Sequence, residues 1–135
     1  MREMLSLKDA GTFHGHLGPY LTIGYMAGVF ASEKLEQKTE FDLEAWVMVP
    51  GKTPYTCIVD GVQCSSKCTL GKGNIHVIDS PKFEIKFKNK KTGKEIRLRI
   101  KREVLETIDE YGEDMEGAVK WIRSKALQEI FEIVE

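Results

Sequence analysis

The feature that most constrains the fold is a run of apolar residues that follows a proline. Pro19 suits the first turn of a helix, and the residues after it continue in a helical pattern to about Leu35. Between Leu21 and Ala31 this helix is apolar on nearly every side. Small residues recur every fourth position on one face, at Gly24, Gly28 and Ser32. A helix that is apolar all round must be buried all round, so we expect a central helix or a subunit interface, and we predict a homodimer.

The composition is that of an ordinary folded domain, because 41% of the 135 residues are hydrophobic and 30% are charged. We predict one domain, residues 1–135. A domain of this size buries roughly two thirds of its unfolded surface, so any metal ligands are candidates for function rather than for folding. The longest apolar stretch, Leu17–Ala31, is shorter than the roughly 20 residues of a bilayer span. The N-terminal residues lack the apolar core of a signal peptide. We therefore expect a cytoplasmic protein with no membrane association.

Alternating apolar residues and turn residues predict the other elements. A short helix over Leu7–Phe13 comes first, with Ser6 as its cap. After the apolar helix we predict a strand over Phe41–Val49, a helix that Thr56 caps and that runs from Cys57 to about Ser66, a strand over Asn74–Ile78, a hairpin that pairs Lys82–Lys88 with Glu95–Lys101, a helix that breaks at Gly112, and a last helix over Met115–Val134. The predicted class is α+β: a two-layer α-β-α-β-β-β core with C-terminal helices packed on a mixed sheet.

The charges are unevenly placed, although the net charge is only -1. Residues 81–105 contain 10 basic and 3 acidic side chains, which would suit a phosphate-binding surface. The basic residues alternate with apolar ones such as Phe83, Ile85 and Phe87, and this alternation is typical of a hairpin with one solvated face. The polar face carries no stacking aromatics, so we predict no nucleic-acid binding.

The residues best suited to chemistry are His14, His16 and Cys57. Imidazole nitrogens and thiolates are natural ligands for a zinc-like ion. A single activated thiolate with a histidine base would instead be a nucleophile. Cys57 is expected at a helix N-terminus, where the helix dipole lowers a thiol pKa. Both chemistries remain open at this point.

The spacing of the three cysteines limits what one ion could bind. Cys57, Cys64 and Cys68 would share one stripe of a continuous helix. Cys57 and Cys64 would then be roughly 10 Å apart along the axis, whereas a zinc–thiolate bond is about 2.3 Å. The helix must therefore stop and fold back if Cys57 and Cys68 are to meet. The alternative is that the cysteines are small buried residues.

Two further polar side chains are candidates. Asp60 lies on the same predicted helix as Cys57, where it could orient a histidine or receive a proton. Lys72 lies in a glycine-rich turn, which does not match a P-loop because glycine and a strand follow the lysine. We expect a tight turn with Lys72 directed into a pocket.

Three blocks of the chain resemble one known family. Residues 13–19 (Phe-His-Gly-His-Leu-Gly-Pro), 57–63 (Cys-Ile-Val-Asp-Gly-Val-Gln) and 68–74 (Cys-Thr-Leu-Gly-Lys-Gly-Asn) are similar in type, order and spacing to the family of the formylmethanofuran dehydrogenase E subunit, FmdE. The resemblance implies an α+β domain, usually dimeric, whose histidines and cysteines gather around a metal in a cleft. It also implies a place in anaerobes and methanogens, beside the molybdenum or tungsten enzyme that reduces carbon dioxide onto methanofuran.

The resemblance can be carried over residue by residue. The matching positions are His14, His16, Cys57, Asp60, Gln63, Cys68, Gly71 and Lys72. The family motif commonly has a cysteine where this chain has Gly18. No cysteine follows Cys68, so the C-terminal zinc ribbon of many members is absent from this sequence.

These observations lead to a specific site prediction. One divalent ion, zinc, is held by His16, Cys57 and Cys68, with His14 or water completing the shell. Cys64 departs from the family pattern and is expected to stay outside. Cys57, Asp60 and Lys72 are the predicted catalytic residues if the site is catalytic.

We accordingly predict a metal-binding protein similar to FmdE, accessory to or acting in anaerobic one-carbon metabolism, including methanogenesis. Association with a molybdenum or tungsten formylmethanofuran dehydrogenase is the predicted heterologous interaction. Two alternatives remain: a small thiol-dependent enzyme that uses Cys57 without a metal, and a purely structural dimeric module.

Overall fold

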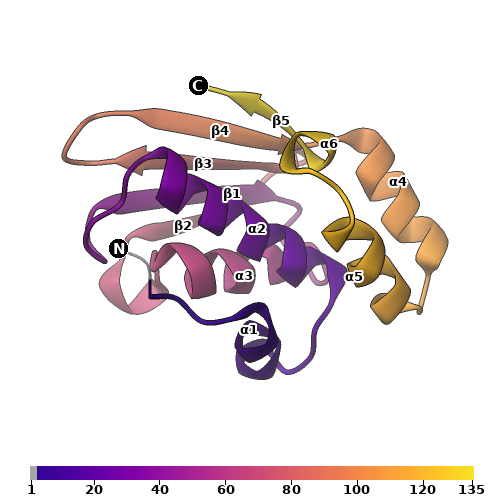
Figure 1. Ribbon diagram of the computed structural model, residues 1–135. Helices are drawn as coiled ribbons and strands as arrows, with labels where there is room; N and C mark the ends of the chain where they lie inside the picture. Colours follow the sequence, from indigo (N-terminus) through magenta and orange to yellow (C-terminus); the bar gives the residue numbers. More distant parts are fainter. Residues whose placement is uncertain (1–2) are drawn as a thin grey trace.

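The computed structural model describes residues 3–135 and confirms the α+β class (Figure 1). Its helices are α1 (Leu7–His14), α2 (Pro19–Lys34), α3 (Cys57–Ser66), α4 (Arg102–Tyr111), α5 (Met115–Arg123) and α6 (Leu127–Ile130), with a 3-10 turn over Leu70–Lys72. Its strands are β1 (Leu43–Val49), β2 (Ile75–Asp79), β3 (Glu84–Asn89), β4 (Glu95–Ile100) and β5 (Phe131–Val134).

The strands form one mixed sheet in the order β2-β1-β3-β4-β5. The pair β1 and β2 is parallel, and the other neighbouring pairs are antiparallel. Helices α2 and α3 lie side by side against one face of the sheet, with α1 beneath them and α4 and α5 at one end (Figure 1). The residues of β1 that face the helices are fully buried, and they alternate with half-buried residues on the other face. This alternation is the predicted pattern of a sheet covered on one side.

The small-residue face of α2 is used inside the chain. A Cβ at Gly24 would overlap the carbonyl oxygen of Ile58 on α3, and a Cβ at Gly61 on α3 would overlap the carbonyl oxygen of Leu21. The two helices therefore pack backbone to backbone, which requires glycine on both. The helix is central, as one of the two sequence interpretations expected. Its glycine face is covered by α3, so this face no longer argues for a dimer.

The predicted last helix over Met115–Val134 is wrong. Helix α5 ends at Arg123, α6 is a single turn, and residues 131–134 form β5. Phe131 pairs with Ile100 and Ile133 with Leu98, so β5 completes an edge of the sheet. The apolar spacing in this segment fits a helix until Ile130, but Phe131 and Ile133 also alternate as a strand requires. The segment becomes a strand because β4 has an edge whose backbone groups it can pair with. That edge comes from a distant part of the chain, so the local sequence pattern does not reveal it.

The two predicted helix caps differ in outcome. Ser6 accepts a hydrogen bond from the Asp9 amide and caps α1, as predicted. Thr56 occupies the position before α3 but makes no capping hydrogen bond with its side chain. No helix within residues 3–135 combines the length and apolarity needed to cross a membrane.

Candidate functional site

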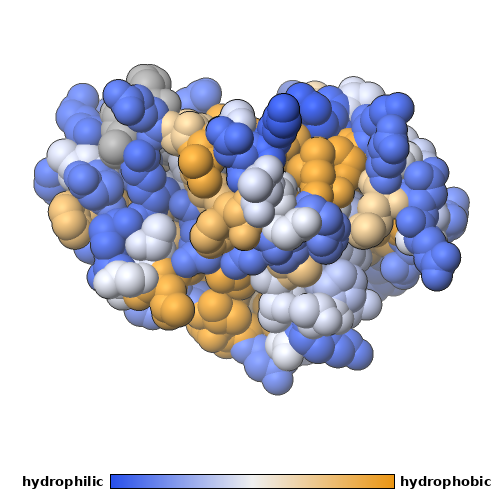
Figure 2. All heavy atoms as spheres, turned by 90° about the horizontal axis from the view of Figure 1, so that it is seen from below, coloured by the Kyte–Doolittle hydropathy of each residue, from blue (hydrophilic) through white to orange (hydrophobic). Residues whose placement is uncertain are grey.

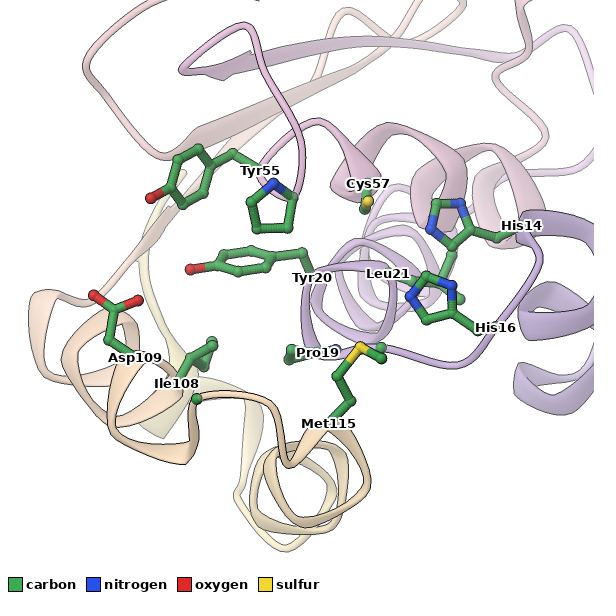
Figure 3. A pocket seen from close by; sticks show the side chains of 13 residues that line it. His14, His16, Pro19, Tyr20, Leu21, Tyr55, Cys57, Ile108, Asp109 and Met115 are labelled. Carbon is green, nitrogen blue, oxygen red and sulfur yellow. The ribbon is translucent and has the colours of Figure 1, made fainter.

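A pocket of about 220 Å³ lies where the N-terminal turns of α2 and α3 meet the end of α4 and the start of α5. The loop that joins α1 to α2 forms one wall. His14, His16 and Cys57 line one end of the pocket, and Tyr20, Tyr55 and Asp109 line the other (Figure 3). The face seen in Figure 2 shows orange apolar patches between polar residues, so the helical side of the molecule is not uniformly hydrophilic.

His14 is held in place by Asp60. Helix α1 ends at His14 because Gly15 takes a left-handed conformation, with a φ of 119°, that reverses the chain. The Nδ1 atom of His14 lies 2.6 Å from Oδ2 of Asp60 on α3, and the histidine side chain is 12% exposed. A carboxylate bound to Nδ1 fixes the ring and leaves Nε2 as the free lone pair of the neutral imidazole.

Asp60 is itself positioned by Gln63. The Nε2 group of Gln63 donates to Oδ1 of Asp60 over 3.3 Å, and its Oε1 accepts from the Leu70 amide over 2.9 Å. Gln63 therefore connects Asp60 to the turn that follows α3. The sequence prediction that Asp60 could orient a histidine agrees with this geometry.

His16 and Cys57 complete the same end of the pocket. The His14 and His16 ring centroids are 5.2 Å apart, and the rings are tilted by 49°. His16 is exposed, so its ring has room to rotate. Among residues 3–135, no group of three His, Cys, Asp or Glu side chains already has the arrangement needed to hold a metal ion. Metal binding would therefore require side chains at this end of the pocket to move.

The expectation of a lowered thiol pKa at Cys57 is wrong. Burial raises the pKa of this thiol, and the nearby Asp60 carboxylate raises it further, while a backbone hydrogen bond acts in the opposite direction. Burial and a like charge oppose formation of the thiolate more than the helix N-terminus favours it. A raised pKa leaves less of the Cys57 side chain as thiolate, which is the form that attacks.

Cys68 does not join His16 and Cys57. Helix α3 runs without a break from Cys57 to Ser66, so Cys57 and Cys68 lie at opposite ends of it. Cys68 is fully buried in the hydrophobic core. Burial raises the pKa of its thiol to about 11. The fold-back that the four-ligand prediction required does not occur.

Lys72 and Cys64 also lie away from this pocket. The Lys72 ammonium donates to Oγ1 of Thr69 over 2.7 Å, near the C-terminal end of α3. Lys72, Cys64 and Gln63 line a separate, open depression. Burial raises the pKa of the Cys64 thiol to about 11, with a smaller contribution from Asp60. The catalytic trio of Cys57, Asp60 and Lys72 is therefore not assembled around one cavity.

Sequence reasoning missed the other half of the pocket. Tyr55, Asp109 and Met115 come from three separate segments, and their spacing gives no signal. Tyr20 falls directly after the histidine block, and this proximity is the one signal that could have pointed to it. Only the fold brings the two tyrosines into edge-to-face contact, with ring centroids 5.4 Å apart.

The donor set tests whether the residues fit the metal that the family resemblance implies. Two imidazoles and one thiol line one pocket, and a carboxylate orients the half-buried imidazole of His14. A Cβ built at Gly18 would lie 3.3 Å from Nε2 of His16 and 3.7 Å from the Met115 sulfur. The cysteine that the family commonly has at this position would thus face His16. Two imidazoles and one thiol are the donor types that suit a zinc-like ion, although within residues 3–135 they are not arranged as a ligand set.

Comparison with known proteins places the chain in a family. Residues 13–133 match the sequence profile described as "FmdE, Molybdenum formylmethanofuran dehydrogenase operon". A curated relative from Archaeoglobus fulgidus, a "probable S-adenosyl-L-methionine-binding protein", is 32% identical over 100 residues. That match covers 72% of this chain and 27% of the relative, so the chain spans about a quarter of the relative's length.

A solved structure supports the fold. The crystal structure of a tungsten formylmethanofuran dehydrogenase FmdE-like protein from Syntrophus aciditrophicus superposes with a TM-score of 0.64 at 24% identity. The likeness covers 98% of this chain and 74% of the other. Because the family profile spans nearly the whole sequence, including the histidine and cysteine blocks that line the pocket, the chain belongs to the FmdE family.

Proposed function

We propose that this protein binds one divalent metal ion through His14, His16 and Cys57, and that this ion is zinc. The observation that carries the proposal is the contact between Nδ1 of His14 and the Asp60 carboxylate. Histidines that bind metals usually donate their other ring nitrogen to a carboxylate or carbonyl. Cys68 and Lys72, which belonged to the sequence prediction, have no part in this revised site.

The three protein ligands leave one coordination position open. Catalytic zinc sites have three protein ligands and one exchangeable position, whereas structural sites are closed by four. The bound ion would act as a Lewis acid toward a group in the pocket. This chain's residues would supply the ligands, orient His14 through Asp60 and present an apolar wall at Tyr20 and Leu21.

The biological setting is proposed from the family. An FmdE-type protein is expected to work in anaerobic one-carbon metabolism, as an accessory to a molybdenum or tungsten formylmethanofuran dehydrogenase or as a small metal-dependent enzyme. The dimer also stays a prediction. Light scattering at micromolar concentration should give a mass near twice the 15.3 kDa of one chain, and a mass near 15.3 kDa would refute the dimer.

The name of the curated relative raises S-adenosyl-L-methionine as a ligand. The pocket volume of about 220 Å³ is below the roughly 300–1,000 Å³ of sites that enclose a drug-sized molecule. The cavity therefore suits a smaller molecule or one end of a larger one. The relative's ligand would fit this pocket only in part.

Cobalt substitution tests the metal proposal, because a cobalt–thiolate bond produces a near-ultraviolet charge-transfer band. The metal-free full chain is titrated with Co²⁺, and the absorbance is followed. We expect the band in the native protein and in Cys64→Ser, which is the matched control. Cys57→Ser should lose it. A band of unchanged intensity in Cys57→Ser, or no band in the native protein, would contradict the proposal.

A further inference from the structure

We propose that the end of the pocket formed by Tyr20, Tyr55 and Asp109 binds the cationic group of a small organic molecule, such as an alkylated ammonium or sulfonium. This inference goes beyond the proposed metal function, because it assigns a ligand class to a part of the cavity that holds none of the proposed metal ligands. Figure 3 shows the two tyrosine hydroxyls and the Asp109 carboxylate together, away from Cys57, His14 and His16.

The charge of the lining favours a cation. Within residues 3–135, no lysine or arginine lines the pocket. Asp109 contributes a carboxylate to its lining. Asp109 forms no ion pair with any described basic residue. Asp109 is exposed and solvated in the free protein, so its field is partly screened. It still repels an anion and attracts a cation at this end of the pocket, which favours a cationic ligand group.

The aromatic rings provide the second element. Tyr20 and Tyr55 are in edge-to-face contact, and Tyr55 makes a second such contact with Phe83, with centroids 5.2 Å apart. The three rings therefore pack against one another in series. Aromatic faces attract alkylated ammonium groups within about 6 Å of the ring centroid. An aromatic wall beside a carboxylate is thus a suitable environment for a bulky cation.

The Tyr20 hydroxyl supplies a hydrogen-bond donor at this end of the pocket. The residue is 4% exposed, and no described residue hydrogen-bonds its hydroxyl. Figure 3 shows the Tyr20 hydroxyl on the side of the Asp109 carboxylate and the Tyr55 hydroxyl, away from the histidines. Burial raises the pKa of this phenol, and Asp109 raises it further, so the group remains a protonated donor at neutral pH. The hydroxyl oxygen itself is open to the pocket, so it can donate to water in the free protein and to a ligand that displaces that water.

The size of the cavity sets the size of the ligand. A volume of about 220 Å³ accommodates a molecule of a few heavy atoms, and Ile108 and Met115 add apolar contacts to the wall. A ligand with a cationic group at one end and an oxygen or sulfur donor at the other could extend toward the histidines. This arrangement would place its donor next to the proposed metal.

Choline and its uncharged isostere 3,3-dimethyl-1-butanol test the proposal, because they differ in charge and hardly in shape. The metal-free full chain is titrated with each, and amide shifts are followed by NMR. We expect choline to bind in the roughly millimolar range for so small a ligand, with shifts near Asp109 and Gly112. The neutral alcohol should bind about tenfold more weakly.

Two variants separate charge from simple packing. Asp109→Asn should reduce choline binding to about the level of the alcohol. Glu110→Gln removes the same charge from the neighbouring, exposed residue of α4, which does not line the pocket, and should leave binding unchanged. Equal binding of the two probes, or an equal effect of both variants, would overturn the proposal.

The choline experiment can also be separated from the test of the metal site. Cys57→Ser should lose the cobalt band and still bind choline. Absence of choline binding in the native protein, together with a normal cobalt band, would refute the cation site alone. The reverse result would refute the metal site alone.

Discussion

Replacing Asp60 with asparagine should weaken metal binding and at the same time make Cys57 more reactive. The substitution preserves the shape of the side chain and removes its charge. The His14 contact of 2.6 Å would become a hydrogen bond between neutral groups. A charge-assisted hydrogen bond contributes about 1.5–3 kcal/mol and a neutral one about 1 kcal/mol.

The magnitude follows from this difference after a discount for solvent. The Asp60 side chain is 35% exposed, so screening reduces the difference to about 1 kcal/mol. Each 1.4 kcal/mol corresponds to about tenfold in affinity, and we therefore expect a loss of roughly fivefold to tenfold. The assay is a competitive zinc titration against a chromophoric chelator. Gln63→Ala removes the 3.3 Å contact to the other carboxylate oxygen and the acceptor for the Leu70 amide. It leaves the contact between His14 and Asp60 in place, so it should have a smaller effect on zinc affinity.

Asp60→Asn should also raise the reactivity of the Cys57 thiol, while it lowers the zinc affinity. Burial is the main cause of the raised Cys57 pKa, and the Asp60 carboxylate is the next. Removing that charge should lower the thiol pKa, so metal-free Asp60→Asn should react faster with iodoacetamide at pH 8 than the native chain. An unchanged zinc affinity, or slower alkylation, would refute the reasoning about this site.

Three further predictions concern stability and the missing ligand. Gly24→Ala should lower the free energy of unfolding by about 1–2 kcal/mol, measured by urea denaturation, because overpacking against α3 exceeds the gain of about 1 kcal/mol in helix propensity; stabilisation would contradict the close packing. Burial raises the pKa of the Asp42 carboxyl, but hydrogen bonds led by Lys91 hold it below its usual range. The ionised Asp42 carboxylate therefore stabilises the folded state, and this contribution should be lost as pH falls below about 4. Asp42→Asn should make the urea midpoint depend less on pH in this range. Gly18→Cys should tighten zinc binding at least about tenfold in the chelator assay, since the new side chain would face His16; unchanged affinity would argue against this geometry.

The elements nearest the site could be predicted because local signals there are strong. Pro19 marks the start of α2. Helix α3 ends at Ser66, as predicted, and Lys67 after it takes the αL conformation. The predicted hairpin is also present, with β3 and β4 pairing over Glu84–Asn89 and Glu95–Ile100. These elements depend on residues that are close in sequence, so composition and spacing are sufficient.

The parts that could not be predicted depend on distant partners. Strand β5 forms because β4 offers an unpaired edge. The Tyr20, Tyr55 and Asp109 end of the pocket is assembled from α2, a loop and α4. The Cys57 pKa has the opposite direction to the one expected, because burial and the Asp60 charge are tertiary effects. Ligand chemistry and family resemblance together pointed to His14, His16 and Cys57. They also pointed to Cys68, which the straight course of α3 keeps away.

The central claim is that one thiolate and two imidazoles bind the metal, and X-ray absorption at the zinc edge of the zinc-loaded full chain tests it most directly. Our account predicts one sulfur at about 2.3 Å and nitrogen or oxygen ligands at about 2.0–2.1 Å. The Cys57→Ser variant should show no sulfur, whereas Cys68→Ser should retain it. Two sulfur ligands in the native protein would restore Cys68 to the site and contradict the account, and so would a shell without sulfur.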